Sequence, residues 1–142
     1  MSSSKVIVVD LDGTLTLTDT LHESVIALIR AKPFMLFLIP IWLAKGVAYL
    51  KFKVAENSVL DVTTLPYNEP FIDWLKEQKA SGKEIVLCTA ANELIAHNVF
   101  KYFDFFDGVI ASDEYTNLKS KNKRDALQKK YGEHGYDYAG NS

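Results

Sequence analysis

The stretch VIVVDLDGTLT, residues 6–16, decides the fold of this 142-residue chain. Four β-branched residues run directly into Asp10, Leu11 and Asp12, and Gly13 follows. A continuous apolar run of this kind is typical of a strand buried on both faces of a parallel sheet, and we expect the strand to span residues 5–10. This first strand therefore ends on two acids that lie one residue apart.

The rest of the chain alternates between short apolar runs and helical patterns. Further strands are predicted at residues 84–89, 108–112 and, with a weaker pattern, 136–140. Helices are predicted at residues 68–82, opened by Asn68 and Pro70 and closed by Gly82, at 92–103 and at 121–132. In the second of these helices, one face carries Ile95, Val99, Tyr102 and Phe103. Alternating strands and helices predict an α/β fold with a doubly wound parallel sheet.

A long segment separates the first strand from the rest of this pattern. We expect a core domain from residues 1–14 and 66–142, and a helical cap inserted between them at residues 15–65. Helix should cover most of residues 21–57, with interruptions at Pro33 and Pro40. The sequence TLHE, residues 20–23, has capping-box spacing, which predicts a helix start near Leu21.

The apolar run FMLFLIPIWLA, residues 34–44, falls within this insertion. A membrane-spanning helix needs about 20 residues, so we interpret the run as a buried or amphipathic helical pair. The alternative is a surface that contacts a membrane or an apolar partner.

Composition excludes some classes of protein. The formal net charge of −2 argues against a general nucleic-acid binder, which would usually be basic. A single cysteine, Cys88, cannot form an internal disulfide, and the N-terminal MSSSK precedes no long apolar segment. We therefore expect a cytoplasmic protein, or one at the cytoplasmic face of a membrane.

The spacing of the two acids, Asp10 and Asp12, indicates a chemical role. Ligands of such sheets bind beyond the carboxyl ends of the strands, and alternation would point Asp10 and Asp12 the same way. Two nearby carboxylates repel each other, and a Mg²⁺ ion would relieve that repulsion. One carboxylate can attack phosphorus while the other transfers protons. A lone Asp-x-Asp-Gly is more often a solvated turn, but here it follows a buried strand.

The sequence DLDGTLT resembles the first motif of the haloacid dehalogenase-like hydrolase superfamily, whose members are mostly phosphatases. The resemblance implies that Asp10 is the nucleophile and Asp12 the general acid and base, with Mg²⁺ bound by Asp10 and the Asp12 carbonyl. It also implies that Gly13 and Thr14 contact the substrate.

Two further motifs of this superfamily have counterparts in the chain. In IVLCTAA, the resemblance implies that the Thr89 hydroxyl and the Ala90 N–H bind a phosphate oxygen. In NLKSKNKRDAL, Lys119 and Lys123 both match the lysine that neutralises the nucleophile and the phosphate. Lys123 is favoured because it opens a helical pattern.

The fourth motif matches least well. The superfamily has an acidic loop that completes the Mg²⁺ shell, and Asn141 stands where its first acid is expected. An amide oxygen can bind Mg²⁺ but brings no charge. Either the chain is a truncated part of a longer protein, which we favour, or the domain has lost its chemistry. We expect this 142-residue form to bind Mg²⁺ weakly.

A second resemblance favours truncation. The segments TDTLHES, TLPYNE, TAAN, TNLK and YDYAGNS together resemble the N-terminal hydrolase-like domain fused to UbiA-type membrane prenyltransferases. This resemblance implies a C-terminal membrane domain in the full-length protein and a phosphorylated small molecule, a prenyl or sugar phosphate, as substrate.

Three functions are consistent with these features. The first is a Mg²⁺-dependent phosphatase domain, and the second is a non-catalytic phosphate-binding or regulatory domain, to which Asn141 points. The third is a response-regulator receiver, but a receiver takes its phosphorylated Asp from a later strand and has no large insertion after the first.

Overall fold

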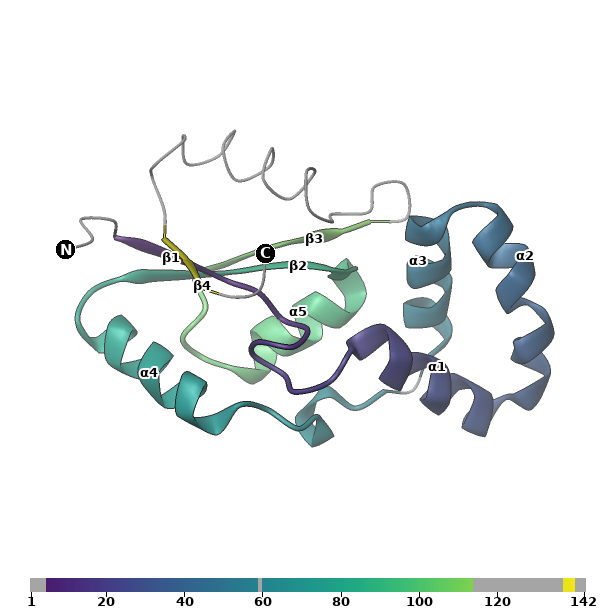
Figure 1. The fold of residues 1–142 in the computed structure, drawn as a ribbon, viewed down its shortest axis with the longest axis horizontal. Helices are drawn as coiled ribbons and strands as arrows, with labels where there is room; N and C mark the ends of the chain where they lie inside the picture. Colours follow the sequence, from purple (N-terminus) through teal and green to yellow (C-terminus); the bar gives the residue numbers. More distant parts are fainter. Residues whose placement is uncertain (1–4, 59, 114–136, 140–142) are drawn as a thin grey trace.

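The fold is a parallel α/β sheet with a helical extension at one end (Figure 1). The computed structural model describes residues 5–58, 60–113 and 137–139. Within them the sheet has four strands in the order β3-β2-β1-β4, and every neighbouring pair is parallel. The strands are β1 (Val6–Val9), β2 (Glu84–Asn92), β3 (Gly108–Ser112) and β4 (Asp137–Ala139). All four predicted strands are therefore confirmed.

Both faces of the sheet are buried. Ile7 and Val9 of β1 join the main apolar cluster together with residues of the helices α4 (Glu69–Ala80) and α5 (Glu93–Tyr102). Val8 and Val86, which alternation directs to the opposite face, are buried as well. Burial on both faces is what a parallel sheet requires, and it confirms the expected doubly wound α/β class.

The helix that precedes β2 begins and ends as predicted. The Asn68 side chain caps α4 by accepting a hydrogen bond from the Phe71 N–H at 3.3 Å, and Pro70 lies in the first turn, where its missing N–H costs nothing. After the last turn, Gly82 has a φ of 96°, a conformation that glycine adopts without strain.

The predicted buried face of α5 is confirmed only in part. Ile95 and Val99 are buried in the main cluster, and Phe103 packs against that cluster. Tyr102 is instead exposed, and its ring stacks on that of Tyr67 with the centroids 5.7 Å apart. Tyr102 is the last residue of α5, where the helical period no longer fixes the direction of a side chain.

The segment between β1 and α4 forms several short helices, as expected. They are α1 (Thr20–Ala31), the 3₁₀ helix η1 (Pro33–Phe37), α2 (Ile39–Ala44), α3 (Val47–Asn57) and the 3₁₀ helix η2 (Val62–Thr64). Pro33 and Pro40 separate the first helices, as predicted, and each lies in the first turn of the helix that it opens. A further break occurs at Gly46, whose φ of 122° disfavours any other residue.

The predicted helix start near Leu21 is confirmed to within one residue, but the capping box at residues 20–23 is not the cap. The N-cap of α1 is Asp19, whose side chain accepts hydrogen bonds from the backbone N–H groups of Leu21 and His22. Thr20 is the first helical residue, and its N–H donates a hydrogen bond to Asp12. His22 is exposed on the helix surface.

The helices α1, η1, α2 and α3 share a small apolar cluster of their own, centred on Leu28, Trp42 and Val54. The apolar run at residues 34–44 contributes one buried side chain, that of Trp42, to this cluster, and its other members there are only partly buried. Phe34, Phe37 and several neighbours are exposed, so most of the run is not buried. The run does form a pair of short helices that pack by one side only, as a partly buried helical pair would.

The two connections between this helical extension and the sheet lie side by side. The Leu17 N–H donates to the Pro66 carbonyl at 2.8 Å, and the Asn68 N–H donates to the Leu15 carbonyl at 2.9 Å. Thr16 and Tyr67 thereby form an antiparallel bridge at this junction. The expected domain limits at residues 15 and 65 stay a prediction.

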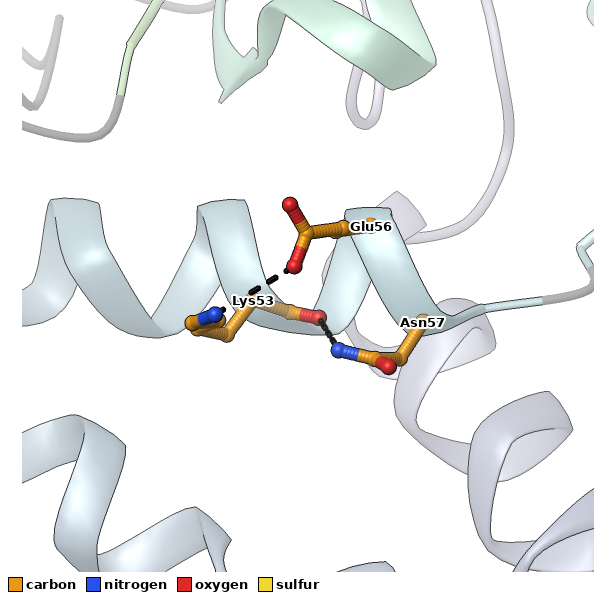
Figure 2. A network of polar contacts seen from close by, with 3 residues as sticks. All are labelled: Lys53, Glu56 and Asn57. Carbon is orange, nitrogen blue, oxygen red and sulfur yellow. Dashed lines mark hydrogen bonds and ion pairs between the residues drawn. The ribbon is translucent and has the colours of Figure 1, made fainter.

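The last turn of α3 is closed by its own side chains (Figure 2). The Asn57 amide donates to the Lys53 carbonyl at 2.9 Å, and the Lys53 ammonium pairs with Glu56 at 3.3 Å. The ion pair is solvent-exposed and contributes little, about 0.3–0.5 kcal/mol.

Among the described residues, no helix is both long enough and apolar enough to cross a bilayer.

Candidate active site

The strand order places Asp10 where such sheets bind ligands. From β1 the chain runs to β2 and then β3 on one side, whereas β4 pairs with β1 on the other side. The carboxyl end of β1 is therefore a topological switch point, beside which open α/β sheets bind their ligands. Asp10 follows β1 directly and is half-buried at this edge.

The loop after Asp10 is held by backbone hydrogen bonds. The Leu11 N–H donates to the Asp10 carboxylate at 3.0 Å, and the Leu15 N–H donates to the Asp10 carbonyl at 3.3 Å. Gly13 turns the chain with a φ of 75° and, like the half-buried Thr14, stays accessible. Leu11 is fully buried between two half-buried acids, which fits the expected alternation.

Asp12 is tied to the first turn of α1. Its carboxylate accepts a hydrogen bond from the buried Thr20 N–H at 2.9 Å. Burial is the largest influence on Asp12 and raises its pKa above the ordinary 3.8; the Thr20 hydrogen bonds oppose this, and the charges of Asp19 and Asp10 add to it. A carboxyl group whose pKa is raised in this way is suited to hold a proton and deliver it.

Thr89 lies in an irregular part of β2. Cys88 pairs with Ile110 of β3, and the next pair is Asn92 with Ser112, so β2 has two more residues than β3 in this interval. Bulges of this kind are common beside active sites, where they redirect side chains and backbone groups. Thr89 is fully buried, and its hydroxyl accepts a hydrogen bond from the Ala91 N–H at 3.0 Å.

Three elements meet at the Ala90 carbonyl. The Lys51 ammonium of α3 donates to this oxygen at 2.9 Å, and the Ser112 hydroxyl at the end of β3 donates to it at 2.8 Å. Lys51 therefore brings a positive charge from the insertion to the residue after Thr89. Lys51 was not predicted as a site residue, because 39 residues separate it from Ala90 and the contact leaves no local signal in the sequence.

Asn92 closes the bulge and caps α5. Its side-chain oxygen accepts a hydrogen bond from the Leu94 N–H at 2.9 Å, while its buried amide nitrogen has no hydrogen-bond partner among the described residues. The N-terminus of α5 therefore carries an unused donor within the same stretch as Thr89 and Ala90. A helix N-terminus with unused donors favours an anion.

Three predicted site residues, Lys119, Lys123 and Asn141, lie outside the described residues. The predicted helix at residues 121–132 lies outside them as well.

The residues at the edge fit a Mg²⁺ site in their chemistry. Mg²⁺ prefers oxygen ligands and usually takes one or two carboxylates, with water and phosphate oxygens completing its shell. Hydrogen bonds among the described residues use the carbonyls of Asp10 and Leu11 but not that of Asp12, which leaves this oxygen available as a ligand. Within residues 5–58, 60–113 and 137–139, no cluster of three or more acidic, His or Cys side chains could hold a metal.

The fold and the carboxyl edge of the sheet define an α/β protein with two acids at the switch point of a parallel sheet.

No known protein-family model matches the chain. The chain is 36% identical over 137 residues to the uncharacterized protein y4nM of Sinorhizobium fredii (strain NBRC 101917 / NGR234). This match covers 96% of the chain, which spans about a quarter of the length (26%) of that relative.

Two solved structures share the fold. A hydrolase from Streptococcus pneumoniae TIGR4 superposes with a TM-score of 0.50 and 16% identity, covering 95% of this chain and 91% of that one. The apo form of phosphoserine phosphatase superposes with a TM-score of 0.55 and 19% identity, covering 89% and 70%. The chain therefore has the fold of a hydrolase and a phosphatase, in agreement with the architecture expected from DLDGTLT.

Proposed function

We propose that this chain is a phosphatase domain of the haloacid dehalogenase-like type that acts through an aspartyl-phosphate on Asp10. The observation that carries the proposal is the pair Asp10 and Asp12 at the switch point of a sheet whose fold is shared with phosphoserine phosphatase. The raised pKa of Asp12 supports different tasks for the two acids.

In the first step, the Asp10 carboxylate attacks the phosphorus of a phosphate monoester. A bond forms between an Asp10 oxygen and phosphorus, the bond from phosphorus to the ester oxygen breaks, and the protonated Asp12 gives its proton to that leaving oxygen. In the second step, Asp12 takes a proton from a water molecule that attacks the same phosphorus. The bond from Asp10 to phosphorus breaks, and inorganic phosphate leaves.

The surrounding residues would stabilise the charge on the phosphoryl oxygens. The Thr89 hydroxyl and the Ala90 N–H would donate to a phosphate oxygen, and the positions of Gly13 and Thr14 beside Asp12 leave them accessible to the substrate. Lys51 would supply one positive charge beside the phosphate, because its ammonium lies 2.9 Å from the Ala90 carbonyl. Lys119 or Lys123 would add a second positive charge. Such positioned charges supply most of the catalysis in phosphoryl transfer.

A Mg²⁺ ion held by Asp10, the Asp12 carbonyl and Asn141 would offset the negative charge of the phosphate when bound. The oxygen donors of the first two residues support this assignment.

The full-length protein is proposed to be larger and to carry a membrane prenyltransferase-type domain after this one. The length of the relative from S. fredii, of which the chain spans about a quarter, supports a longer parent. A prenyl or sugar phosphate would then be the substrate.

The test is hydrolysis of p-nitrophenyl phosphate with Mg²⁺ by the wild-type chain, by Asp10→Asn and by the control Asp73→Asn. Asp73 is an exposed acid of α4. We expect Asp10→Asn to lose turnover by ~10³-fold or more, whereas Asp73→Asn keeps it. Equal turnover of wild type and Asp10→Asn would exclude the aspartyl-phosphate mechanism.

A second arm distinguishes the alternative function. If neither this chain nor a version extended beyond Ser142 hydrolyses a panel of phosphate esters, the phosphatase proposal fails. Binding of inorganic phosphate to wild type but not to Thr89→Val would then favour the non-catalytic phosphate-binding domain.

A further inference from the structure

The far end of the helical extension exposes a concentration of large apolar side chains. We call this surface the apolar tip; its exposed members are Phe34, Leu36, Phe37, Ile41, Leu43 and Val47. Phe37 is 78% exposed and Phe34 is 62% exposed. Scattered exposed apolar residues are normal, but six within fourteen consecutive positions are unusual and mark an interaction site.

The apolar tip is exposed because the cluster beneath it takes only one side of each short helix. Trp42 is buried against Leu28 and Val54, and Met35 and Leu38 pack on the same cluster. η1 and α2 have five and six residues, so each presents its remaining apolar side chains outward. The exposure therefore follows from the packing of the extension.

The charged residues that lie near the apolar tip in the sequence are all basic. Between residues 24 and 55 the chain has five basic residues (Arg30, Lys32, Lys45, Lys51, Lys53) and no acidic residue, although the whole chain has a net charge of −2. Arg30 and Lys45, which flank the apolar run, are both exposed. An apolar surface with exposed basic residues on both sides of its segment complements an anionic lipid surface.

The apolar tip lies away from the proposed active site. α2 is farther from the sheet than α3, whose Lys51 reaches the Ala90 carbonyl (Figure 1). A flat surface could therefore contact the apolar tip while the carboxyl edge of the sheet stays uncovered.

We propose that the apolar tip docks on the surface of an anionic lipid bilayer. Phe34, Phe37 and their apolar neighbours enter the headgroup region, and Arg30 and Lys45 pair with lipid phosphates and carboxylates. The docking is peripheral and does not depend on phosphatase activity.

The experiment is co-sedimentation of the full 142-residue chain with vesicles of phosphatidylcholine alone and with 30% phosphatidylserine. We expect binding to the anionic vesicles, at least about tenfold weaker binding to the neutral ones, and weaker binding as salt rises. Absence of binding to anionic vesicles at low salt would overturn the proposal.

Matched variants connect the binding to the apolar tip. Arg30→Glu/Lys45→Glu should weaken vesicle binding at least about tenfold. Lys76→Glu/Lys101→Glu makes the same change in net charge at exposed lysines of α4 and α5, and it should weaken vesicle binding much less. Equal losses from the two pairs would mean that net charge alone drives binding, which contradicts docking through the apolar tip.

Two apolar variants test insertion. Phe34→Ser/Phe37→Ser and, separately, Leu36→Ser/Ile41→Ser should each weaken vesicle binding at least about tenfold, with circular dichroism confirming that helices remain. Unchanged vesicle binding in both folded variants would overturn the proposal. So would sedimentation showing that the wild-type chain forms a dimer which Phe34→Ser/Phe37→Ser abolishes, because a second copy would then cover the apolar tip.

Discussion

Asp12 has an observed structural contact and a proposed catalytic task, which two substitutions can separate. Its carboxylate binds the buried Thr20 N–H at 2.9 Å, and in the proposed reaction it transfers protons. Asp12→Asn keeps an oxygen that can accept from Thr20 but cannot transfer a proton. Asp12→Ala removes both. We expect the two variants to lose turnover alike and to differ in stability.

The magnitudes follow from these contacts. Positioned acid–base catalysis contributes about 10²–10⁴-fold, or about 3–5 kcal/mol of the activation barrier, so both variants should slow turnover by that factor. Asp12→Ala also leaves the Thr20 N–H unpaired in a residue that is only 1% exposed. An unpaired buried donor costs about 1–3 kcal/mol in the free energy of unfolding, a cost that Asp12→Asn should avoid.

The pH dependence gives a third test. Because burial raises the pKa of Asp12 in the folded state, its protonated form contributes stability that is fully present below the unfolded value of 3.8. That contribution is lost as pH rises through the folded pKa. Asp12→Asn, which stays neutral, should therefore gain stability relative to wild type as pH rises from 4 to neutral. The wild-type rate should fall over the same rise as Asp12 loses the proton of the general acid.

The assay is urea unfolding of wild type and both variants from pH 4 to 8, combined with p-nitrophenyl phosphate turnover. Equal stabilities of Asp12→Asn and Asp12→Ala would refute the structural role of the Thr20 hydrogen bond. Turnover within threefold of wild type in Asp12→Asn would refute the proposed proton transfer.

Three further predictions concern other parts of the molecule. Leu28→Ala should lower the free energy of unfolding by about 2–5 kcal/mol in urea titrations, because Leu28 is fully buried in the cluster of the helical extension; a loss below about 1 kcal/mol would contradict that packing. Burial raises the pKa of Asp107, but hydrogen bonds from Lys79 and a backbone N–H outweigh burial and hold the pKa below 3.8. The stabilisation by Asp107 should therefore be present at neutral pH and lost as pH falls below about 4. Asp107→Asn should remove that part of the acid sensitivity, and an unchanged difference in urea midpoint between pH 7 and pH 3 would contradict this prediction. Lys51→Met should raise KM for an aryl phosphate by about tenfold with a smaller change in kcat, whereas Lys53→Met, which removes an exposed ion pair and contacts with the rings of Tyr49 and Phe52, should change neither. Equal effects would argue against a substrate contact by Lys51.

Local sequence signals predicted the elements whose causes are local. The β-branched run before Asp10 and the run at residues 84–89 form buried strands because β-branched side chains suit a parallel sheet covered on both faces. Asn68 and Gly82 mark the ends of α4 because capping involves neighbouring backbone groups alone. The alternation of Asp10 and Asp12 around the buried Leu11 is local in the same way.

The start of α1 required more than the local pattern. Both Asp19 and Thr20 are good N-cap residues, and TLHE favoured Thr20. In the structure Asp19 is the cap, and Asp12, eight residues before Thr20, accepts from the Thr20 N–H that a capping box would bond to Glu23.

The sequence by itself determined the strands, most helix ends and the pair of acids, because these depend on side-chain period and on contacts within one turn. Only the tertiary structure decided that β4 lies beside β1, which makes the end of β1 a switch point. It also brought Lys51 to the Ala90 carbonyl and left Phe34 and Phe37 exposed. These features depend on which surfaces meet after folding, and hydrophobicity along the chain does not specify which apolar side chains find a partner.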